Sequence, residues 1–220
     1  PSAYYFPTVG RLRAIEVVKG PAAITQGPYT IGGALNMVST SIPNEMSGNV
    51  VTEAGEDSTY RVHATYGGRT DSGFGFLLET HQWQSDGFQS SDRSSNNSGL
   101  DVEDYTLKLS YSPMNSAHAI ELKLQATVQN SNQSYLGLTD SDFSNSAFRR
   151  YGVSELDNIE TEHEQQILRY SDDINDALDM SITAYNNEHQ RNWFKTEGID
   201  FDGSAAAKDF NRTSWFNVIQ

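Results

Sequence analysis

Residues 120–129 read IELKLQATVQ, a run in which apolar and polar side chains alternate strictly. One set holds Ile120, Leu122, Leu124, Ala126 and Val128, and the other holds Glu121, Lys123, Gln125, Thr127 and Gln129. Successive side chains of a β-strand point to opposite faces, whereas the apolar positions of a helix recur every three or four residues. The run therefore predicts a long strand with one apolar face and one polar face.

The same alternation recurs on both sides of this run. It is clear at 60–66, 105–111 and 178–184, and weaker at 48–54, 74–88, 162–170 and 212–220. The chain is therefore predicted to be mainly β, with about eight strands. The strands within 118–133 and 177–193 can each be drawn as ~16 residues, well beyond the ~5–6 residues typical of globular proteins.

The connections between these strands are alternately short and long, except that the first, around 55–57, is brief on what would be the long side. The short ones are 68–73, 113–116 and 172–176, and the long, polar ones are 89–102, 133–161 and 194–211. In an antiparallel meander this alternation places every long connection at the same end of the sheet. Long strands, one apolar face and such asymmetry are typical of an outer-membrane barrel, and the alternative is a soluble β-sandwich.

Composition excludes several classes of protein. The 220 residues carry a net charge of −14, which gives no electrostatic basis for binding nucleic acid. The absence of cysteine excludes thiol catalysis, cysteine-ligated zinc and disulfides. The five histidines show no metal-ligand spacing, and no serine lies in a nucleophile-elbow context. We therefore expect neither an enzyme nor a metal site.

Residues 1–43 lack the meander. Two short apolar runs, 14–18 and 34–38, are separated by turns rich in glycine and proline, which predicts a small α/β piece. The pair Gly32-Gly33 suggests backbone that needs positive φ or close packing. Both ends of the sequence look like cuts, so we interpret the chain as an internal fragment of a longer protein.

A resemblance becomes specific in this first region. The blocks RAIEVVKGP at 13–21, QGP at 26–28 and IGGALNMV at 31–38 resemble the closing segment of the plug domain of TonB-dependent outer-membrane receptors. Lys19 and Met37 depart from the commoner residues only in detail. The resemblance implies that 1–43 are the C-terminal part of an α/β plug. It also implies that 44–220 are the N-terminal third of an antiparallel transmembrane β-barrel of about 22 strands.

A second stretch is similar to the ferric-citrate-type receptors. It comprises YLGLTDSDF at 135–143, FRRY at 148–151 and EHEQ at 162–165. This resemblance implies a Gram-negative outer-membrane transporter that imports ferric citrate or a similar siderophore, with the ferric chelate as cargo and no resident cofactor. The implied partners are outer-membrane lipid and the TonB energy-transducing complex, whose contact segment lies outside these residues. Alternatives are a receptor for another solute, such as cobalamin or a glycan, and a surface β-sandwich adhesin.

The candidate ligand contacts lie on the long connection at 133–161. Arg149 and Arg150 are adjacent arginines in an acidic chain, and guanidinium groups pair with the carboxylates of an anionic chelate in bidentate fashion. Phe148 and Tyr151 flank them. By resemblance Tyr4, Tyr5 and Tyr29 are weaker candidates near the outer surface of the plug. The alternative is a loop that packs on its neighbours through ordinary salt bridges.

The resemblance also implies an ion-pair lock between plug and barrel, because buried charges must be paired. We expect the lock to include Arg13, Glu16 and Lys19 of the plug and Glu121 of the barrel. Arg11 is a further plug charge, and further barrel candidates are Arg61, His63, Lys108, Lys123 and Asp179. The alternative is that Arg13 and Lys19 are solvated turn charges.

Overall fold

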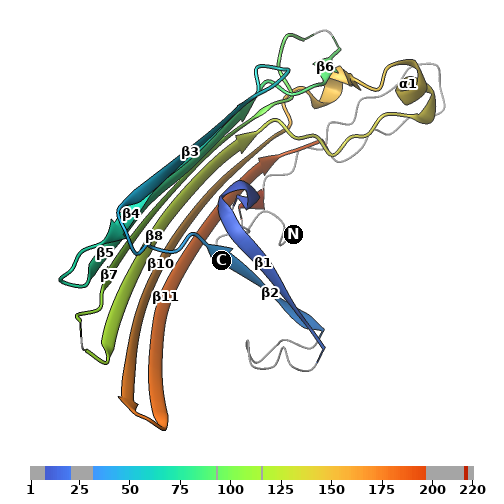
Figure 1. Cartoon of the computed structure of the whole chain (residues 1–220). Coiled ribbons are helices and arrows are strands. Elements are labelled where there is room, and N and C mark those ends of the chain that lie inside the picture. The colour runs from blue at the N-terminus through green and yellow to red at the C-terminus, as the bar shows by residue number, and fades with distance from the viewer. Residues whose placement is uncertain (1–7, 21–31, 93, 115, 197–215, 218–220) are drawn as a thin grey trace.

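A computed structural model describes residues 8–20, 32–92, 94–114, 116–196 and 216–217. Its main feature is a curved antiparallel sheet of eight strands (Figure 1). The strands are β3 (Ser47–Ala54), β4 (Tyr60–Arg69), β5 (Phe74–Ser85), β7 (Leu100–Tyr111), β8 (His118–Ser131), β10 (Asn158–Asn175), β11 (Leu178–Phe194) and β12 (Phe216–Asn217). Each pairs with the next of these along the chain, so the sheet is a meander.

All eight regions predicted from alternation contain a strand of this sheet, which confirms the mainly β meander. The strands β8, β10 and β11 have 14, 18 and 17 residues, far more than the ~5–6 residues of an ordinary strand. None of the three contains glycine or proline, the residues that interrupt strands. The absence of these residues allows the alternation to continue along the whole strand.

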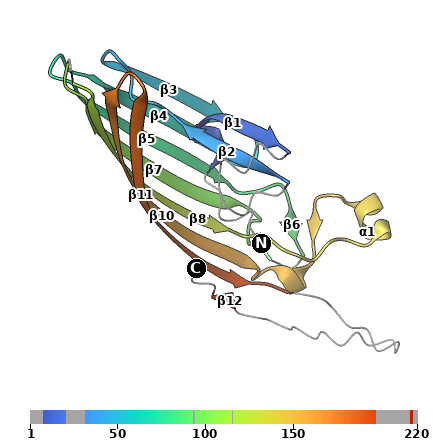
Figure 2. The ribbon, with the colours of Figure 1, turned by 90° about the horizontal axis from the view of Figure 1, so that it is seen from below.

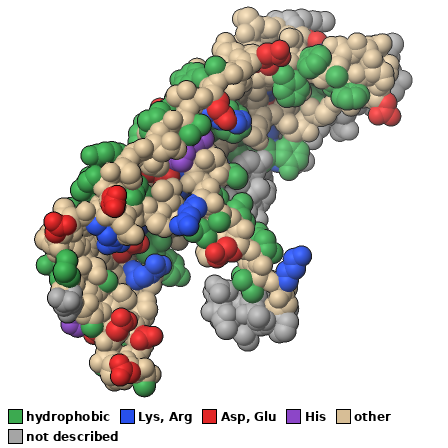
Figure 3. All heavy atoms as spheres, viewed as in Figure 1, with side chains coloured by type: hydrophobic (Ala, Val, Ile, Leu, Met, Phe, Trp, Pro, Cys, Tyr) green, Lys and Arg blue, Asp and Glu red, His purple; other side chains and the backbone are tan. Residues whose placement is uncertain are grey.

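The two faces of the sheet differ in chemistry. On β7 the even-numbered side chains from Val102 to Ser110 are buried, and most of them are polar, whereas Tyr105 and Tyr111 on the opposite face are half exposed. The outward face is apolar elsewhere too, with Val50, Leu78 and Ile182 exposed. In Figure 3 the hydrophobic side chains follow the outer, left-hand margin of the sheet. On β7 the sheet therefore buries polar side chains on its concave face and exposes apolar side chains on the opposite face.

This arrangement contradicts the β-sandwich alternative. A sandwich buries the apolar faces of two sheets against each other. Among the described residues, the large sheet is contacted on its polar, concave face by the segments at the two ends of a two-stranded hairpin, through Arg11 and Thr40, while the hairpin strands extend away from it (Figures 1 and 2). Few hydrophobic side chains are fully buried in this part of the chain: Ile42, Leu77, Val102, Ile159 and Trp193.

The hairpin comes from the N-terminal region. A 3-10 turn, η2 (Val9–Arg11), leads into β1 (Leu12–Lys19), which pairs antiparallel with β2 (Gly33–Ser39). The two predicted apolar runs lie inside these strands. Gly33 has a φ of 150°, and a Cβ there would lie 2.7 Å from the carbonyl oxygen of Val18, so a close backbone approach requires glycine. Residues 21–31, which any α/β character would involve, lie outside the described residues.

The short turns that join β4 to β5, β7 to β8 and β10 to β11 lie at the end of the sheet opposite the long connections, as predicted, and the brief turn between β3 and β4 lies at the end of the long connections (Figure 1). The long connections contain structure that the sequence did not indicate. In them lie β6 (Ser90–Ser91), α1 (Asp140–Asn145), β9 (Arg149–Arg150) and the 3-10 turn η4 (Gly152–Ser154). The strands β6 and β9 pair in parallel and join two connections that are far apart in sequence. No helix in the described ranges is long and apolar enough to cross a membrane.

Candidate functional site: the seat of the hairpin on the sheet

A buried ion pair joins the hairpin to the concave face. Arg11 ends η2 and is 1% exposed, and Asp104 of β7 is fully buried. The Arg11 Nε lies 2.8 Å from Oδ1 of Asp104 and donates a hydrogen bond of 2.9 Å to Oδ2. Thr127 of β8 donates a second hydrogen bond, of 2.7 Å, to the same Oδ2. Removing one partner of a buried charge pair is costly, because the remaining charge stays buried without a counter-charge.

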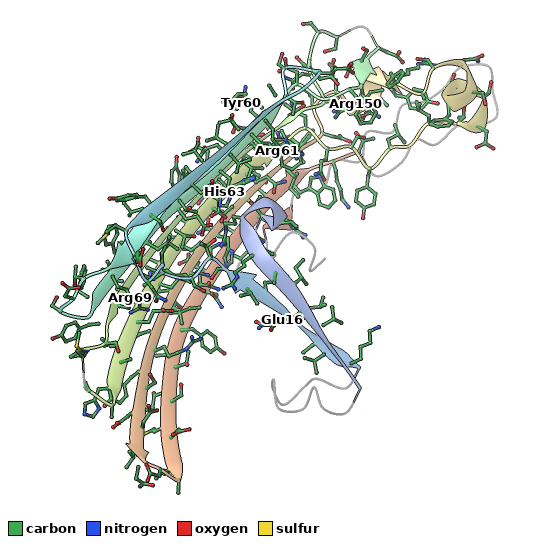
Figure 4. The ribbon with its side chains drawn as sticks, viewed as in Figure 1. Glu16, Tyr60, Arg61, His63, Arg69 and Arg150 are labelled. Atoms are coloured by element: carbon green, nitrogen blue, oxygen red, sulfur yellow. The ribbon has the colours of Figure 1, made fainter. Side chains whose placement is uncertain are left out.

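A second contact holds the chain just after β2. The Thr40 hydroxyl donates a hydrogen bond of 2.6 Å to Oε1 of Glu79 on β5. Lys108 of β7 donates one of 2.7 Å to the backbone carbonyl of Thr40. The Nε2 of His63 on β4 lies 2.9 Å from the same Glu79 oxygen. The hairpin is therefore fixed to the sheet at both of its chain ends, and its tip extends away from the sheet (Figure 4).

Gly10 lies close against the sheet. A Cβ at this position would lie 2.3 Å from Nε2 of His81 on β5. His81 is itself buried, so its ring has little room to move away. The seat therefore depends on the missing side chain of Gly10 as well as on charge.

The residues that the sequence assigned to the lock lie elsewhere. Arg13 donates to the Ser41 hydroxyl at 3.4 Å, and Glu16 accepts from Asn36 across the hairpin at 2.8 Å. Lys19 is exposed at the tip, and Glu121 is half-buried on the concave face of β8. Figure 4 shows Glu16 on the part of β1 that extends away from the sheet. In the described residues the buried ion pair between this segment and the sheet is that of Arg11 and Asp104, and the roles of Arg13, Glu16, Lys19 and Glu121 in a lock stay predictions.

Sequence reasoning named Arg11 and Lys108 but missed Asp104, Glu79 and Thr40. The signal for the two carboxylates was present. Asp104 occupies the same face of its strand as Lys108, and Glu79 lies opposite Leu78 in an alternating run. The charged residues on the polar face of each strand are therefore the candidates for contact with the hairpin. Which of them makes the contact depends on its position along the strand.

Two rows of side chains cross the concave face through the register of neighbouring strands. The histidine row comprises His63, His81, Asp104, Thr127, His163 and His189. The arginine–tryptophan row lies two residues nearer the long connections and comprises Arg61, Trp83, Val102, Gln129, Thr161 and Arg191. Most members of both rows line a cavity of about 720 Å³, which Thr8–Gly10 also line. Figure 4 shows Arg61 and His63 on the side of β4 that faces the hairpin.

The candidate ligand arginines form part of the packing of the long connections. Nε and Nη2 of Arg149 donate to the two carboxylate oxygens of Asp92 at 2.9 Å each, and Nη1 donates to Asp142 at 2.7 Å. Donating hydrogen bonds to Asp92 raises the pKa of Arg149. The hydroxyls of Tyr151 and Thr139, hydrogen-bonded to Asp142, lower the pKa of that carboxyl. This geometry is the one expected under the alternative to ligand binding, in which the loop packs on its neighbours through ordinary salt bridges.

Arg150 is buried, and its guanidinium donates to the backbone carbonyls of Asn132, Ser154 and Asp157. Burial lowers the pKa of this group. Phe148 is exposed and its ring packs edge-on against Phe88 at 6.2 Å. The predicted contacts Tyr4, Tyr5 and Tyr29 lie outside the described residues. Ligand contact by any of these residues therefore stays a prediction.

The described ranges contain no group of three or more His, Asp or Glu side chains placed to hold a metal ion. The site can thus do two things chemically. It can hold the hairpin rigidly through a buried charge pair, and it can offer a cavity with aromatic and hydrogen-bonding walls next to that pair.

No family model matches the chain. Its fold is similar to solved structures of much longer proteins. The unliganded ferric citrate transporter FecA matches with a TM-score of 0.68 at 21% identity, over 88% of this chain and 29% of that chain. The siderophore receptor PiuA from Acinetobacter baumannii matches with a TM-score of 0.69 at 16% identity, over 84% of this chain and 27% of that one.

The ferric yersiniabactin uptake receptor FyuA from Yersinia pestis matches with a TM-score of 0.71 at 14% identity, over 86% of this chain and 30% of that chain. The chain therefore spans about three tenths of the length of these structures. Identities this low establish the fold, and a shared fold does not by itself establish function. The predicted fold class, a mainly β part of a larger receptor barrel, is confirmed. The proteins named here are a transporter and receptors, not enzymes.

Proposed function

We propose that the chain is part of a TonB-dependent outer-membrane transporter that imports a ferric chelate. In this proposal residues 1–43 end the plug and residues 44–220 form the first third of the barrel. One observation carries it: a hairpin is seated by the buried pair of Arg11 and Asp104 on the polar face of a sheet whose other face is apolar and exposed. A soluble domain would bury the opposite face.

The outward face suits contact with lipid. Its hydrophobic side chains include Val50, Leu78, Tyr105 and Ile182, which are 65%, 52%, 52% and 56% exposed. In hydrocarbon every strand amide must be paired, so such a sheet spans a membrane as part of a closed barrel. Short turns mark the periplasmic end of an outer-membrane barrel and long connections mark the extracellular end. On this basis the loops that carry α1 and β9 face the outside of a Gram-negative cell.

The seat suggests how energy could be coupled to transport. At rest the Arg11–Asp104 pair and the Thr40–Glu79 contact hold the hairpin against the wall. The TonB complex would supply the force that separates them, and the polar concave face would then border an open path. No resident cofactor is needed, because the iron travels as part of the cargo.

The cargo is proposed only as a class. The loop resemblance favours ferric citrate, and all three solved structures reported above carry ferric or siderophore cargo in their names. Loop similarity transfers poorly to ligand identity. Cobalamin or a glycan remains an alternative within the same architecture.

The proposal is tested in the full-length protein, expressed in a Gram-negative strain that lacks its own ferric-chelate receptors. We expect uptake of radioactive iron from a ferric chelate that needs an intact TonB complex. Arg11→Ala should impair this uptake and increase leakage of a small antibiotic through the barrel. Arg13→Ala serves as the matched control, because Arg13 contacts only the segment after β2 in the described structure. Absence of iron uptake by the wild-type protein would refute the proposal.

A further inference from the structure

We propose that the outer edge of the membrane hydrocarbon crosses the sheet obliquely. On β3 to β8 the outward side chains contact acyl chains at register positions where those of β10 and β11 already stand in the polar layer outside the membrane. This placement rests on the proposed function and adds to it where the membrane ends on the sheet. The side chains that support it all lie on the outward face, away from the hairpin.

One row of register partners on the outward face changes in chemistry as it crosses the sheet. In strand order from β3 to β11 the row comprises Val50, Ala64, Thr80, Tyr105, Ala126, Glu164 and Glu188. The members on β3 to β8 are apolar apart from one threonine, and Val50 and Tyr105 are 65% and 52% exposed. The members on β10 and β11 are exposed glutamates. A row that ran parallel to the membrane plane would have the same surroundings, and one chemistry, along its whole length.

More carboxylates follow the acidic end of this row. Glu162 and Glu160 come next after Glu164 on the same face of β10, toward the long connections, and both are exposed. In the described strands of the large sheet no lysine or arginine shares the outward face. Those of the sheet lie on the concave face: Arg61, Arg69, Lys108, Lys123, Arg169 and Arg191. Charged side chains are costly in hydrocarbon, so three successive outward glutamates without a cation indicate that this part of β10 lies outside it.

The two glutamates of the row also face each other. Glu164 and Glu188 are direct register partners on adjacent strands. Neither carboxylate makes an ion pair within the described ranges. Like charges directly opposite destabilise a sheet, and their repulsion is small only in a medium of high dielectric constant. The pairing of Glu164 with Glu188 therefore favours water, and not acyl chains, around this part of β10 and β11.

The tilt of barrel strands accounts for the slant. Strands of a barrel tilt by ~35–45° from its axis, and neighbouring strands lie ~4.8 Å apart. Each step along a register row therefore changes the height in the membrane by about 3 Å. The six steps from Val50 to Glu188 change it by about 18 Å. Because the apolar band of such a barrel is ~25 Å tall, one row can begin inside the band and end outside it.

The same strands are apolar nearer the short turns. The outward row four residues in that direction comprises Phe76, Leu109, Leu122, Leu168 and Ala184, so it is apolar on every strand from β5 to β11. Ile182, two residues beyond Ala184, is 56% exposed. The outward face of β11 therefore passes from hydrocarbon to the polar layer between Ala184 and Glu188.

The test places spin labels on single cysteines of the full-length receptor in a phosphatidylcholine bilayer. The 220 residues contain no cysteine, and any cysteine elsewhere in the receptor is first replaced by serine. At Val50→Cys and Ile182→Cys we expect the label to collide more often with oxygen, which concentrates in hydrocarbon, than with a water-soluble nickel complex. At Glu188→Cys the ratio of oxygen to nickel collisions should be at least threefold lower. Glu56→Cys, in the exposed turn between β3 and β4, gives the ratio for water.

The results separate the two claims. High ratios at Val50, Ile182 and Glu188 alike would refute the oblique edge and leave the proposed function standing. Ratios at all three as low as that at Glu56 would show that the outward face does not contact hydrocarbon, so the proposed function would fail and the oblique edge with it. A low ratio at Val50 with a high one at Glu188 would refute the direction of the slant. Should Glu188→Cys not insert, Glu162→Cys on β10 decides the same question.

A second measurement needs no label. Val50→Glu places a carboxylate in hydrocarbon and should lower the fraction of receptor that inserts into the outer membrane severalfold. Gln190→Glu is the matched control, because it adds the same charge to the outward face of β11 on the side of the long connections and should insert as the wild type does. Equal insertion of the two variants would refute the oblique edge.

Discussion

Two arginine–aspartate sites in this chain have nearly the same nitrogen–oxygen distances and very different surroundings. Arg11 meets Asp104 at 2.8 Å where their side chains are 1% and 0% exposed. Arg149 meets Asp92 at 2.9 Å and Asp142 at 2.7 Å, where the three side chains are 37%, 32% and 30% exposed. The first pair joins hairpin to sheet, and the second joins two long connections.

The two sites differ in whether water can solvate the aspartate once the arginine is removed. Water can solvate the loop carboxylates when Arg149 is removed, so an exposed pair contributes little to stability. Asp104 is fully buried, so the loss of Arg11 leaves an uncompensated buried charge. We therefore expect the loss of one partner to be costly at the hairpin seat and to cost little in the exposed loop network.

Removal of Arg11 should have the largest effect. For Arg11→Ala in the full-length protein, we expect the free energy of opening of the hairpin to fall by about 3–5 kcal/mol, because Asp104 stays buried and charged. Hydrogen exchange of the β1 amides measures this opening. A fall of less than about 1 kcal/mol, typical of an exposed pair, would show that the seat is not desolvated.

The double variant Arg11→Met with Asp104→Leu is the control for charge. Replacing a buried ion pair by hydrophobic residues of similar volume is often neutral, so the β1 amides should regain most of their protection. Under the proposed function, the same variant should also lose the release of the hairpin that is driven by the TonB complex. If it is as unstable as Arg11→Ala, the seat depends on some feature other than the pairing of charges.

Gly10→Ala should have the next largest effect, through space instead of charge. A Cβ would lie 2.3 Å from Nε2 of the buried His81, so the ring or the hairpin must shift. Overpacking of this kind costs about 1–3 kcal/mol, measured by the same exchange of β1 amides. Gly32→Ala is the matched control, since nothing lies within 4 Å of its added Cβ. Equal results for the two variants would contradict the close approach.

The sequence predicted the sheet well because its signal is local. Alternation in a run such as 120–129 depends on the strand alone, so it identifies both the strand and its polar face. The seat is different. Alternation places Asp104, Lys108 and Glu121 on the concave face, but it does not show which of them lies where the hairpin segment contacts the sheet. That position depends on where Arg11 packs on the sheet, which is a tertiary contact.

The long connections show the other limit of prediction. The strands β6 and β9 have two residues each, and the residues that pair, Ser90 and Arg149, are far apart in the chain. No periodic pattern can indicate so short a pairing. The adjacent arginines drew attention because of their charge. Their actual partners, Asp92 for Arg149 and backbone carbonyls for Arg150, follow from the fold of the connection.

Arg149→Ala should loosen the loops and leave the seat intact. We expect faster hydrogen exchange across α1 and β9, because the guanidinium that bridges Asp92 and Asp142 is gone, and no change at β1. Arg149→Lys should restore only part of the protection, since an ammonium group cannot pair with two carboxylates in the same planar way. High salt should weaken the wild-type loop network and not the buried seat. Equal salt sensitivity at both places would contradict the contrast.

The smallest effect should come from acid. Hydrogen bonds from Tyr151 and Thr139, and then the charge of Arg149, hold the pKa of Asp142 below its ordinary value of 3.8. A carboxyl whose pKa is depressed by folding stabilises the fold above its unfolded pKa and loses that contribution as the pH falls through the folded pKa. We therefore expect the protection of α1 to be constant from neutral pH to about pH 4 and to decrease below it. Asp142→Asn should remove this pH dependence, and Asp140→Asn, at an exposed position two residues before Asp142, should keep it; a decrease that begins near neutral pH would point to a different group.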